Sequence, residues 1–397
     1  MKKCATCSKS LSESAFPADG HGRLRPHCRP CWNGARSSGR PNGPPAKALP
    51  REEKLDQVVE HRLKARNAQL EMRIKGLLED LSSAKRFNDF AREVANTKVE
   101  GIKPRERGTK GNVHEATALV LASDWHIEER VLPQQVANRN KYDLDISAQR
   151  MTRFFEATRY GLVFNRQIFK IRDLVLWLGG DFITNYLHED NVQSNLLAPV
   201  EAIAYAHASI VAGIHHLLGD KELERIVIPC NDGNHGRLSK KVNSATRIEN
   251  SLEWLLYKMI AESFKNEPRV QFLIPESVQT YLEIYGRTVR FTHGDSVNYH
   301  GGVGGVTIPI YKALANWNTV RPAALTCMGH FHQLTSLNDL IINGSLIGYN
   351  PYAMGIGARF EPPAQSMTIL DPLRFKSISM PLWVGSREDD VNTKGRR

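Results

Sequence analysis

The sequence predicts an α/β protein in which a large domain, residues 115–385, follows a small four-cysteine module and a long helix. Three observations support this prediction. Four cysteines form two Cys-x2-Cys pairs near the N-terminus, residues 51–98 carry apolar side chains at helical spacing, and residues 115–385 contain five apolar runs that each end in metal-competent side chains. Apolar runs of this kind are typical of the central strands of a sheet.

The N-terminal cysteines are spaced as Cys4-x2-Cys7 and Cys28-x2-Cys31. Each pair makes a tight turn that aims two thiolates at one ion, and the intervening loop closes both pairs on it. This spacing predicts a structural Zn²⁺ site, with two disulfides or a tail of free thiols as the alternatives. Arginines also cluster on and behind the second pair, where they suit phosphate contacts. These arginines are Arg23, Arg25, Arg29, Arg36 and Arg40.

Composition divides the chain into six segments. Residues 37–50 are rich in Ser, Gly and Pro and are predicted to be a linker. The expected segments are a zinc module (1–36), a linker (37–50), a helix (51–98), a basic linker (99–114), a catalytic domain (115–385) and a polar tail (386–397).

The predicted helix, residues 51–98, contains no proline and a single glycine. In a heptad register the d positions hold Leu63, Leu70, Leu77 and Ala84, and the a positions hold Asn67, Ile74 and Leu81. A polar residue at position a fixes the register of a coiled coil, so a homodimer through this helix is one expectation. A long helix packed on the body, with its basic face in solvent, is the other.

The net charge of +11 lies entirely in the first 110 residues. Residues 1–110 carry 24 Lys and Arg against 13 Asp and Glu, whereas residues 111–397 carry 29 against 29. A basic appendage on a neutral body indicates a polyanionic partner, with DNA or RNA the first candidates, and a solubilising tail is the alternative.

Membrane and secretory signals are weak in this sequence. No apolar stretch follows Met1-Lys2-Lys3, so a secretory signal is not expected. The longest uncharged run, residues 202–219, has 18 residues but contains three histidines and much alanine, which favours a buried helix over a membrane span. We therefore expect a protein without a membrane partner in the cytoplasm, or in the host cytoplasm if a phage encodes it.

Five apolar runs in the body end in side chains that can bind metal. His330 and His332 alone fit either a metal site or a surface turn, although side chains at i and i+2 of an extended segment point the same way. Cys230 and Cys327 lie inside such runs and are expected to be core residues. The five runs end in Asp124-Trp125-His126, Gly180-Asp181, Gly233-Asn234-His235, His293-Gly294-Asp295 and Gly329-His330-Phe331-His332.

This order of motifs, D-x-H, G-D, G-N-H, H and G-H-x-H, resembles the calcineurin-like metallophosphoesterase superfamily. The resemblance implies a two-sheet β-sandwich flanked by helices, with two divalent metal ions at the sheet ends. The implied roles are Asp124, His126 and His332 on the first ion, Asn234, His293 and His330 on the second, Asp181 as the bridge between them, and His235 beside the metals, acting on the leaving group. A hydroxide between the ions would be the nucleophile. Such ligands accept Mn²⁺, which we expect, or Fe or Zn.

The sequence departs from the superfamily pattern after G-N-H. Many members carry an acidic residue there, whereas this chain has Gly236 and then Arg237. We expect Asp232 or Asp295 to supply the missing support for His235. Two further segments are left open. Residues 185–190 include Asn185, His188, Glu189 and Asp190, which fit surface positions as well as substrate contacts, and the glycine-rich residues 300–306 fit a plain loop better than a phosphate contact.

The superfamily acts on several phosphoesters, so the resemblance leaves the substrate open. The N-terminal stretch also resembles the small zinc modules at the front of phage and mobile-element nucleases. Together with the basic excess, this favours the nuclease branch: a metal-dependent DNA nuclease anchored by its N-terminal half. The alternatives are a phosphatase or nucleotide phosphodiesterase with another substrate, and a nucleic-acid-binding protein with a secondary metal centre.

Overall fold

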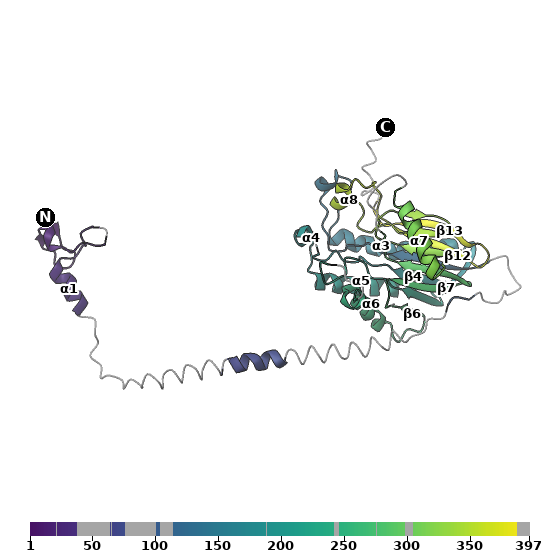
Figure 1. Ribbon diagram of the computed structural model, residues 1–397, viewed down its shortest axis with the longest axis horizontal. Coiled ribbons are helices and arrows are strands. Elements are labelled where there is room, and N and C mark those ends of the chain that lie inside the picture. Colours follow the sequence, from purple (N-terminus) through teal and green to yellow (C-terminus); the bar gives the residue numbers. More distant parts are fainter. Residues whose placement is uncertain are drawn as a thin grey trace. The chain divides into compact units, whose positions relative to one another are not determined.

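The computed structural model describes residues 1–20, 22–37, 64, 66–75, 101–103, 114–187, 189–241, 246–274, 276–297 and 305–386 (Figure 1). The chain divides into two compact units, Met1–Ser83 and Ala84–Arg397, and each is described by itself.

The first unit is a small module built around the cysteines. A short antiparallel hairpin pairs β1 (Lys2–Lys3) with β2 (Ser10–Leu11), and a 3-10 turn at Glu13–Ala15 leads to helix α1 (Arg29–Ser37). Its buried core consists of Phe16, Cys4 and Cys28. So few apolar side chains make a marginal core, and small domains with such cores are usually stabilised by a metal or by cross-links.

Part of the predicted long helix lies within the described residues. Residues 66–75 are helical, and Leu70, Met72 and Ile74 are exposed on them. Leu63, Leu77, Leu81 and Ala84 lie outside the described residues. The homodimer through residues 51–98 therefore stays a prediction.

The second unit contains two large sheets. The six-stranded sheet has the order β13-β12-β3-β4-β5-β6, in which β3, β4, β5 and β6 are parallel and β12 runs antiparallel to both β3 and β13. Its strands are β3 (His114–Ala122), β4 (Phe169–Leu178), β5 (Arg225–Pro229), β6 (Val270–Leu273), β12 (Ala364–Asp371) and β13 (Phe375–Trp383).

The five-stranded sheet has the order β10-β11-β9-β8-β7. Strand β9 runs parallel to both β8 and β11, while β7 and β10 pair antiparallel at the two edges. Its strands are β7 (Gln279–Ile284), β8 (Arg287–Thr292), β9 (Leu325–Met328), β10 (Thr335–Ser336) and β11 (Leu340–Ile342).

The two sheets pack face to face around a shared apolar core. Leu119 and Leu121 of β3 point into this core together with Phe291 of β8, while the alternate residues Ala118 and Val120 point to the opposite face of the sheet. This alternation with period two lets a continuous apolar run be buried on both faces. The prediction of a two-sheet sandwich is confirmed.

Helices cover both outer faces of the sandwich. The second face of the six-stranded sheet packs against helices α3 (Leu144–Asn165), α5 (Pro199–Leu218) and α6 (Leu252–Ser263). Helix α7 (Thr307–Val320) packs on the five-stranded sheet through Ile310 and Leu314. The remaining elements are α4 (Glu189–Ser194), α8 (Pro351–Gly355) and the 3-10 turns η2 (Pro133–Val136) and η3 (Ile248–Asn250).

Helix α5 accounts for most of the long uncharged run. Its Ile203, Ile210 and Ile214 are buried against the sheet, as expected for a core helix. None of the helices in the described part of the chain has the length and apolar character needed to cross a membrane. Cys230 and Cys327 are both fully buried, which confirms their prediction as core residues.

Residues 101–103 were expected in a basic linker, but the structure places them on the edge of β7. Ile102 forms a parallel bridge with Ile284, donates its N–H to the carbonyl of Glu283 (2.9 Å) and accepts the N–H of Tyr285 (2.8 Å). Its side chain is 1% exposed within the core between the sheets. The segment therefore covers an edge strand that would otherwise present unpaired backbone groups.

We predict that Ile102→Ala destabilises the second unit by about 2–5 kcal/mol, because it removes a buried side chain and leaves a cavity. Urea unfolding of the full chain measures the change. Lys103→Ala is the matched control, since Lys103 is exposed and its loss should stay within about 0.5 kcal/mol. Equal stability of the two variants would contradict the docking of this segment.

Candidate metal centre

The structure brings six of the sequence-predicted ligands into two groups. Each group offers three ligand atoms that all lie within 4.8 Å of one another. The first group is Asp124, His126 and His332, and the second is Asp181, His293 and His330. Because β3, β4, β8 and β9 end at the same edge of the sandwich, residues far apart in the sequence meet there.

Asn234 adjoins the second group. Its Oδ1 lies 3.2 Å from Nε2 of His293, so an amide oxygen is available beside the three ligand atoms of that group. His235, the next residue, lies instead beside the first group, with its ring centroid 4.9 Å from that of His126. The G-N-H segment therefore contacts both groups with consecutive residues.

Asp181 joins the two groups. Its Oδ2 lies 3.0 Å from Nε2 of His293, and its Oδ1 accepts the N–H of His235 at 2.8 Å. Its backbone carbonyl accepts the N–H of His126 at 3.1 Å. A second link runs through Asp124, whose carboxylate accepts the N–H of His330 at 2.9 and 3.1 Å. These contacts connect the two groups directly and fix their relative position.

Five of the seven predicted ligands have left-handed backbones. The φ angles are 58° at Asp124, 47° at His126, 52° at Asp181, 68° at His330 and 53° at His332. Such conformations cost on the order of 1–3 kcal/mol each in non-glycine residues and concentrate at functional sites. Strand β9 ends at Met328, and the two histidines beyond it enter different groups, as the resemblance implied.

Two glycines allow the loops to approach each other. A Cβ added to Gly180, which has φ +88°, would lie 2.2 Å from the backbone nitrogen of Gly233. A Cβ on Gly329 would lie 2.4 Å from Oδ2 of Asp124. No other residue fits these positions without displacing the ligand loops.

The protonation states fit a cation. Burial holds the pKa of His126 well below its usual value and lowers that of His330 to about 4, so both imidazoles are neutral. Burial also opposes the charge of His293 and His332, but Asp181 and Asp124 outweigh it and raise their pKa values, so these two rings must each release a proton when a cation binds. Burial raises the pKa of Asp181, but the neighbouring histidines, His293 first, outweigh it and keep the carboxylate ionised. Neutral imidazoles and ionised carboxylates are the donors that Mn, Fe and Zn accept. The residues present therefore fit two divalent ions.

Backbone carbonyls fix the ring orientation of two histidines. His293 Nδ1 lies 2.8 Å from the carbonyl of Gly179, and His235 Nδ1 lies 2.8 Å from that of Thr184. A carbonyl only accepts, so each Nδ1 carries a proton, and Nε2 is the nitrogen that becomes available to a metal when the ring is neutral. For His293 this nitrogen faces Asp181. Partners of this kind orient histidine ligands and tune their basicity.

The expectation that Asp232 or Asp295 supports His235 is wrong. Both carboxylates bind Arg247 instead, at 2.7 Å each. The support for His235 comes from the Thr184 carbonyl. A sequence offers no signal for this contact, because every residue has a carbonyl.

Glu253 of α6 is a residue that the sequence did not reveal. It is fully buried and accepts the N–H of Phe182 (2.6 Å) and of Gly233 (2.7 Å), so it clamps the two loops that carry Asp181 and Asn234. A Cβ on Gly236 would lie 2.8 Å from Cγ of Glu253. The carboxylate thus fills the space beside the position where an acidic residue was expected.

Glu128 and Asn185 hold the loop after β4. Oε1 of Glu128 accepts the N–H of Thr184 (2.7 Å) and of Asn185 (2.8 Å). Asn185 in turn donates from Nδ2 to the carbonyls of His235 (3.0 Å) and Arg237 (2.9 Å). Asn185 is therefore a buried positioning residue rather than a surface one.

The described part of the chain contains only some of the other residues that the sequence left open. Glu189 and Asp190 are exposed in the first turn of α4. His188 and residues 300–304 lie outside the described residues.

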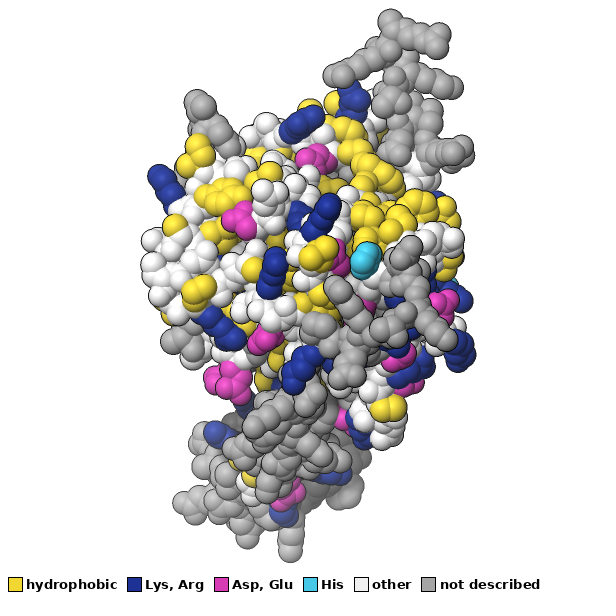
Figure 2. All heavy atoms as spheres, turned by 90° about the vertical axis from the view of Figure 1, so that its right-hand side faces the viewer, with side chains coloured by type: hydrophobic (Ala, Val, Ile, Leu, Met, Phe, Trp, Pro, Cys, Tyr) yellow, Lys and Arg dark blue, Asp and Glu magenta, His cyan; other side chains and the backbone are white. Residues whose placement is uncertain are grey.

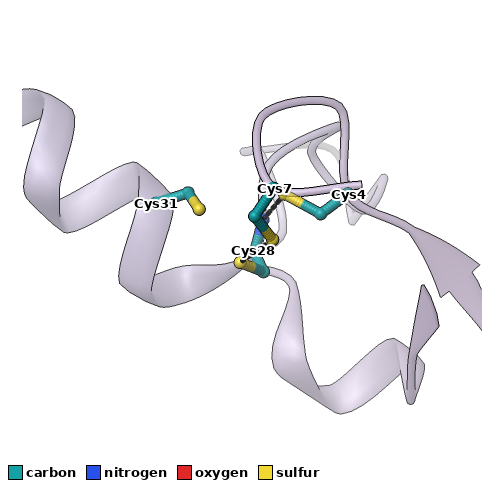
Figure 3. A group of neighbouring side chains, drawn as sticks. All are labelled: Cys4, Cys7, Cys28 and Cys31. Carbon is teal, nitrogen blue, oxygen red and sulfur yellow. Dashed lines mark hydrogen bonds between the residues drawn. The ribbon is translucent and has the colours of Figure 1, made fainter. Parts of the chain in front are cut away.

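The four N-terminal cysteines converge in the first unit (Figure 3). Their sulfurs all lie within 4.8 Å of one another, and those of Cys7 and Cys28 are 3.8 Å apart. A tetrahedron with Zn–S bonds of about 2.3 Å has edges of about 3.8 Å. Backbone hydrogen bonds, from Cys7 first, lower the pKa of Cys4 to about 6, which favours a thiolate. All four cysteines are free, so the group could hold one metal ion.

The predicted phosphate-binding arginines surround this group only in part. Arg23 and Arg29 are exposed, and the guanidinium of Arg25 lies 4.4 Å from the ring centroid of Trp32. Arg36 belongs to α1, but its side chain is not among the described ones, and Arg40 lies outside the described residues.

The fold and the site together define a mixed α/β sandwich with two adjacent groups that could each hold a divalent ion. No family model matches the chain. No curated protein matches it either.

The chain is similar to several solved structures at low identity. Vacuolar protein sorting 29 from Cryptosporidium parvum is 11% identical, with 65% of this chain and 86% of that chain covered and a TM-score of 0.28. A hypothetical protein from Pyrococcus horikoshii is 12% identical over 70% and 92%, with a TM-score of 0.33. A predicted phosphoesterase from Streptococcus pneumoniae is 12% identical over 67% and 97%, with a TM-score of 0.25. Similarity at this level carries no conclusion about substrate.

We predict that Glu253→Gln lowers the affinity of the centre for Mn²⁺ by about 10- to 100-fold, the usual effect of losing a group that orients metal ligands. In glutamine an NH₂ group replaces one of the two carboxylate oxygens, and this group cannot accept the backbone N–H that the oxygen accepted. Chelator competition measures the affinity. Glu262→Gln on the same helix is the control, since its side chain reaches solvent, and an equal affinity in both variants would contradict the clamp.

A second prediction concerns pH. Burial raises the pKa of Glu128 from 4.5 to about 7 in the folded protein. Its contribution to stability is therefore full below about pH 4.5 and is lost as the pH rises through 7. Glu128→Gln keeps one acceptor and cannot titrate, so the Tm difference between variant and wild type should shift in the variant's favour by a few degrees from pH 5 to pH 8. A pH-independent difference in metal-free protein would contradict the raised pKa.

Proposed function

We propose that this chain is a two-metal phosphodiester hydrolase that cuts DNA. The observation that carries the proposal is Asp181, which contacts both ligand groups and ties them into one centre. A carboxylate in this position suits a pair of ions that act on one phosphate.

Two divalent ions, if bound by these residues, would supply a nucleophile from water near neutral pH and would neutralise the charge that develops on the phosphate. The chain's own part is to hold the ligands in place. Asp124 and Asp181 provide the negative charge, and burial keeps His126 and His330 neutral by lowering their pKa values. The hydrogen-bonded loops restrict the centre to one geometry, so little reorganisation accompanies the reaction.

His235 is the proposed proton donor to the leaving oxygen. Its Nδ1 donates to the Thr184 carbonyl and its backbone N–H donates to Asp181, so the ring is held with Nε2 as the nitrogen that exchanges a proton. Its ring packs edge-on against His126, which places it at the first group. Histidine is suited to this step because its pKa lies near neutral pH.

The N-terminal unit supports a nucleic-acid substrate. It combines a four-cysteine group with exposed arginines and an Arg25–Trp32 stack, a pairing of cation and aromatic ring common in nucleic-acid contacts. On the face of the second unit seen in Figure 2, basic, acidic and apolar side chains are interspersed, and the basic ones form no single continuous patch there. We therefore assign polyanion anchoring mainly to residues 1–110, which hold the net charge.

A phosphodiesterase with a small substrate is the second candidate. The balanced charge of residues 111–397 favours it, because a domain without a basic excess does not attract a long polyanion electrostatically. The two candidates differ in what the full chain cuts.

The first test is cleavage of plasmid DNA by the full chain with Mn²⁺, Fe²⁺ or Zn²⁺, compared with hydrolysis of bis(p-nitrophenyl) phosphate. We expect both activities, and both should disappear with a chelator. Hydrolysis of the ester without any DNA cleavage would favour the second candidate.

The paired variants Asp181→Asn and His235→Asn test the roles at the centre. Asn tolerates the left-handed backbone of residue 181, so Asp181→Asn removes charge without added strain and should lower both bound metal and turnover. His235→Asn should keep the metal and reduce kcat by about 10²–10⁴. Metal analysis and single-turnover kinetics separate the two. Loss of metal in His235→Asn would mean that His235 is a ligand.

A further inference from the structure

A pocket opens beside Asn234, next to the second ligand group. Its volume is only about 20 Å³, enough for a water molecule, so it is a shallow polar depression rather than an enclosed small-ligand site. Its lining residues are Gly233, Asn234, Arg237, Ser239, Arg247, Asn250 and Asp295.

The two arginines of this pocket differ in their partners. Arg247 lies between Asp232 and Asp295 at 2.7 Å from each, so its charge is neutralised. Arg237 has no carboxylate partner among the described residues; its Nε donates to the carbonyl of Ser239 (3.1 Å) and its Nη1 to that of Asn234. A half-buried guanidinium held only by carbonyls keeps its full charge, and an anion that reached it would offset its desolvation.

Arg237 is preorganised. Asn185 donates from Nδ2 to the Arg237 carbonyl at 2.9 Å, and the two carbonyl contacts hold the guanidinium beside Asn234. A planar guanidinium fixed in this way suits the oxygens of a phosphate. Lys240 and Lys241 follow within four residues and are exposed, so residues 237–241 carry three cations and no acid.

The positions of His235 and Asn234 indicate which part of a substrate would lie at this pocket. His235 lies against His126 of the first group, so the leaving oxygen departs there. Asn234 contacts His293 of the second group and lines the pocket. The part of the substrate that keeps the scissile phosphate therefore extends toward Arg237.

We propose that Arg237, Lys240 and Lys241 bind the next phosphate of a nucleic-acid strand, on the side that retains the scissile phosphate. This inference rests on the proposed nuclease function and adds a defined subsite to it. It assigns sequence-independent strand binding to the second unit, since phosphate contacts position a strand without reading its bases.

The test compares p-nitrophenyl esters with the same leaving group. One is the single-phosphate ester of thymidine, and the other is the ester of dithymidylate, which adds one phosphate; both the 5′ and the 3′ series are made. In wild-type full chain the added phosphate should raise kcat/KM by about 10- to 100-fold in one series, as expected for a hydrogen bond between charged groups. In Arg237→Gln/Lys240→Gln/Lys241→Gln this gain should fall below about threefold.

The control is Lys221→Gln/Arg374→Gln. These residues are exposed and lie before β5 and between β12 and β13, at the opposite edge of the sheet, so the gain should persist. No gain in wild type, or an equal gain in the triple variant, overturns the subsite. Ester hydrolysis with a gain but without DNA cleavage would instead count against the nuclease function alone.

Binding provides a readout independent of turnover. Affinity of the full chain for a single-stranded oligonucleotide is measured in chelator at several salt concentrations. Losing the neutralisation of this one phosphate should flatten the slope of log K against log salt by about 0.7. The N-terminal unit is present in every variant and contributes equally. A slope equal to that of the control variant would overturn the proposal.

Discussion

The structure of the centre depends on one buried carboxylate. Asp181 accepts the N–H of His235, faces the ring of His293 and takes the N–H of His126 on its carbonyl. Its charge would be costly to bury without these partners. The neighbouring histidines and backbone donors stabilise it, and the same contacts bring the ends of β3, β4 and β8 to one place. The sandwich positions the strands, and Asp181 determines how closely their ends approach.

Strain and burial at this edge are offset by the rest of the second unit. The left-handed ligands cost several kcal/mol together, and Glu128 and Glu253 are carboxyls kept fully buried. Burial raises the pKa of Glu128 to about 7 and that of Glu253 to about 8, which shows how unfavourable their charges are there. The apolar core between the sheets and the helices on their outer faces compensates for these costs.

The N-terminal unit follows a different principle. It has almost no apolar core, and its four cysteine sulfurs lie within 4.8 Å of one another, where they could hold one metal ion. The second unit has an extensive core and balanced charge. The two units thus differ in construction, since the first is built around four cysteines and the second around an apolar core.

The sequence by itself determined the strands, the buried helix α5, the cysteine group and the ligands that follow strand ends, because all of these depend on local spacing. Only the tertiary structure decided which loops Glu253 clamps, that Arg247 takes both Asp232 and Asp295, and that Ile102 covers β7. These contacts join residues that lie far apart in the chain or need only a backbone partner. Their side chains carry no motif, since any buried carboxylate or apolar residue at the right place in space would serve.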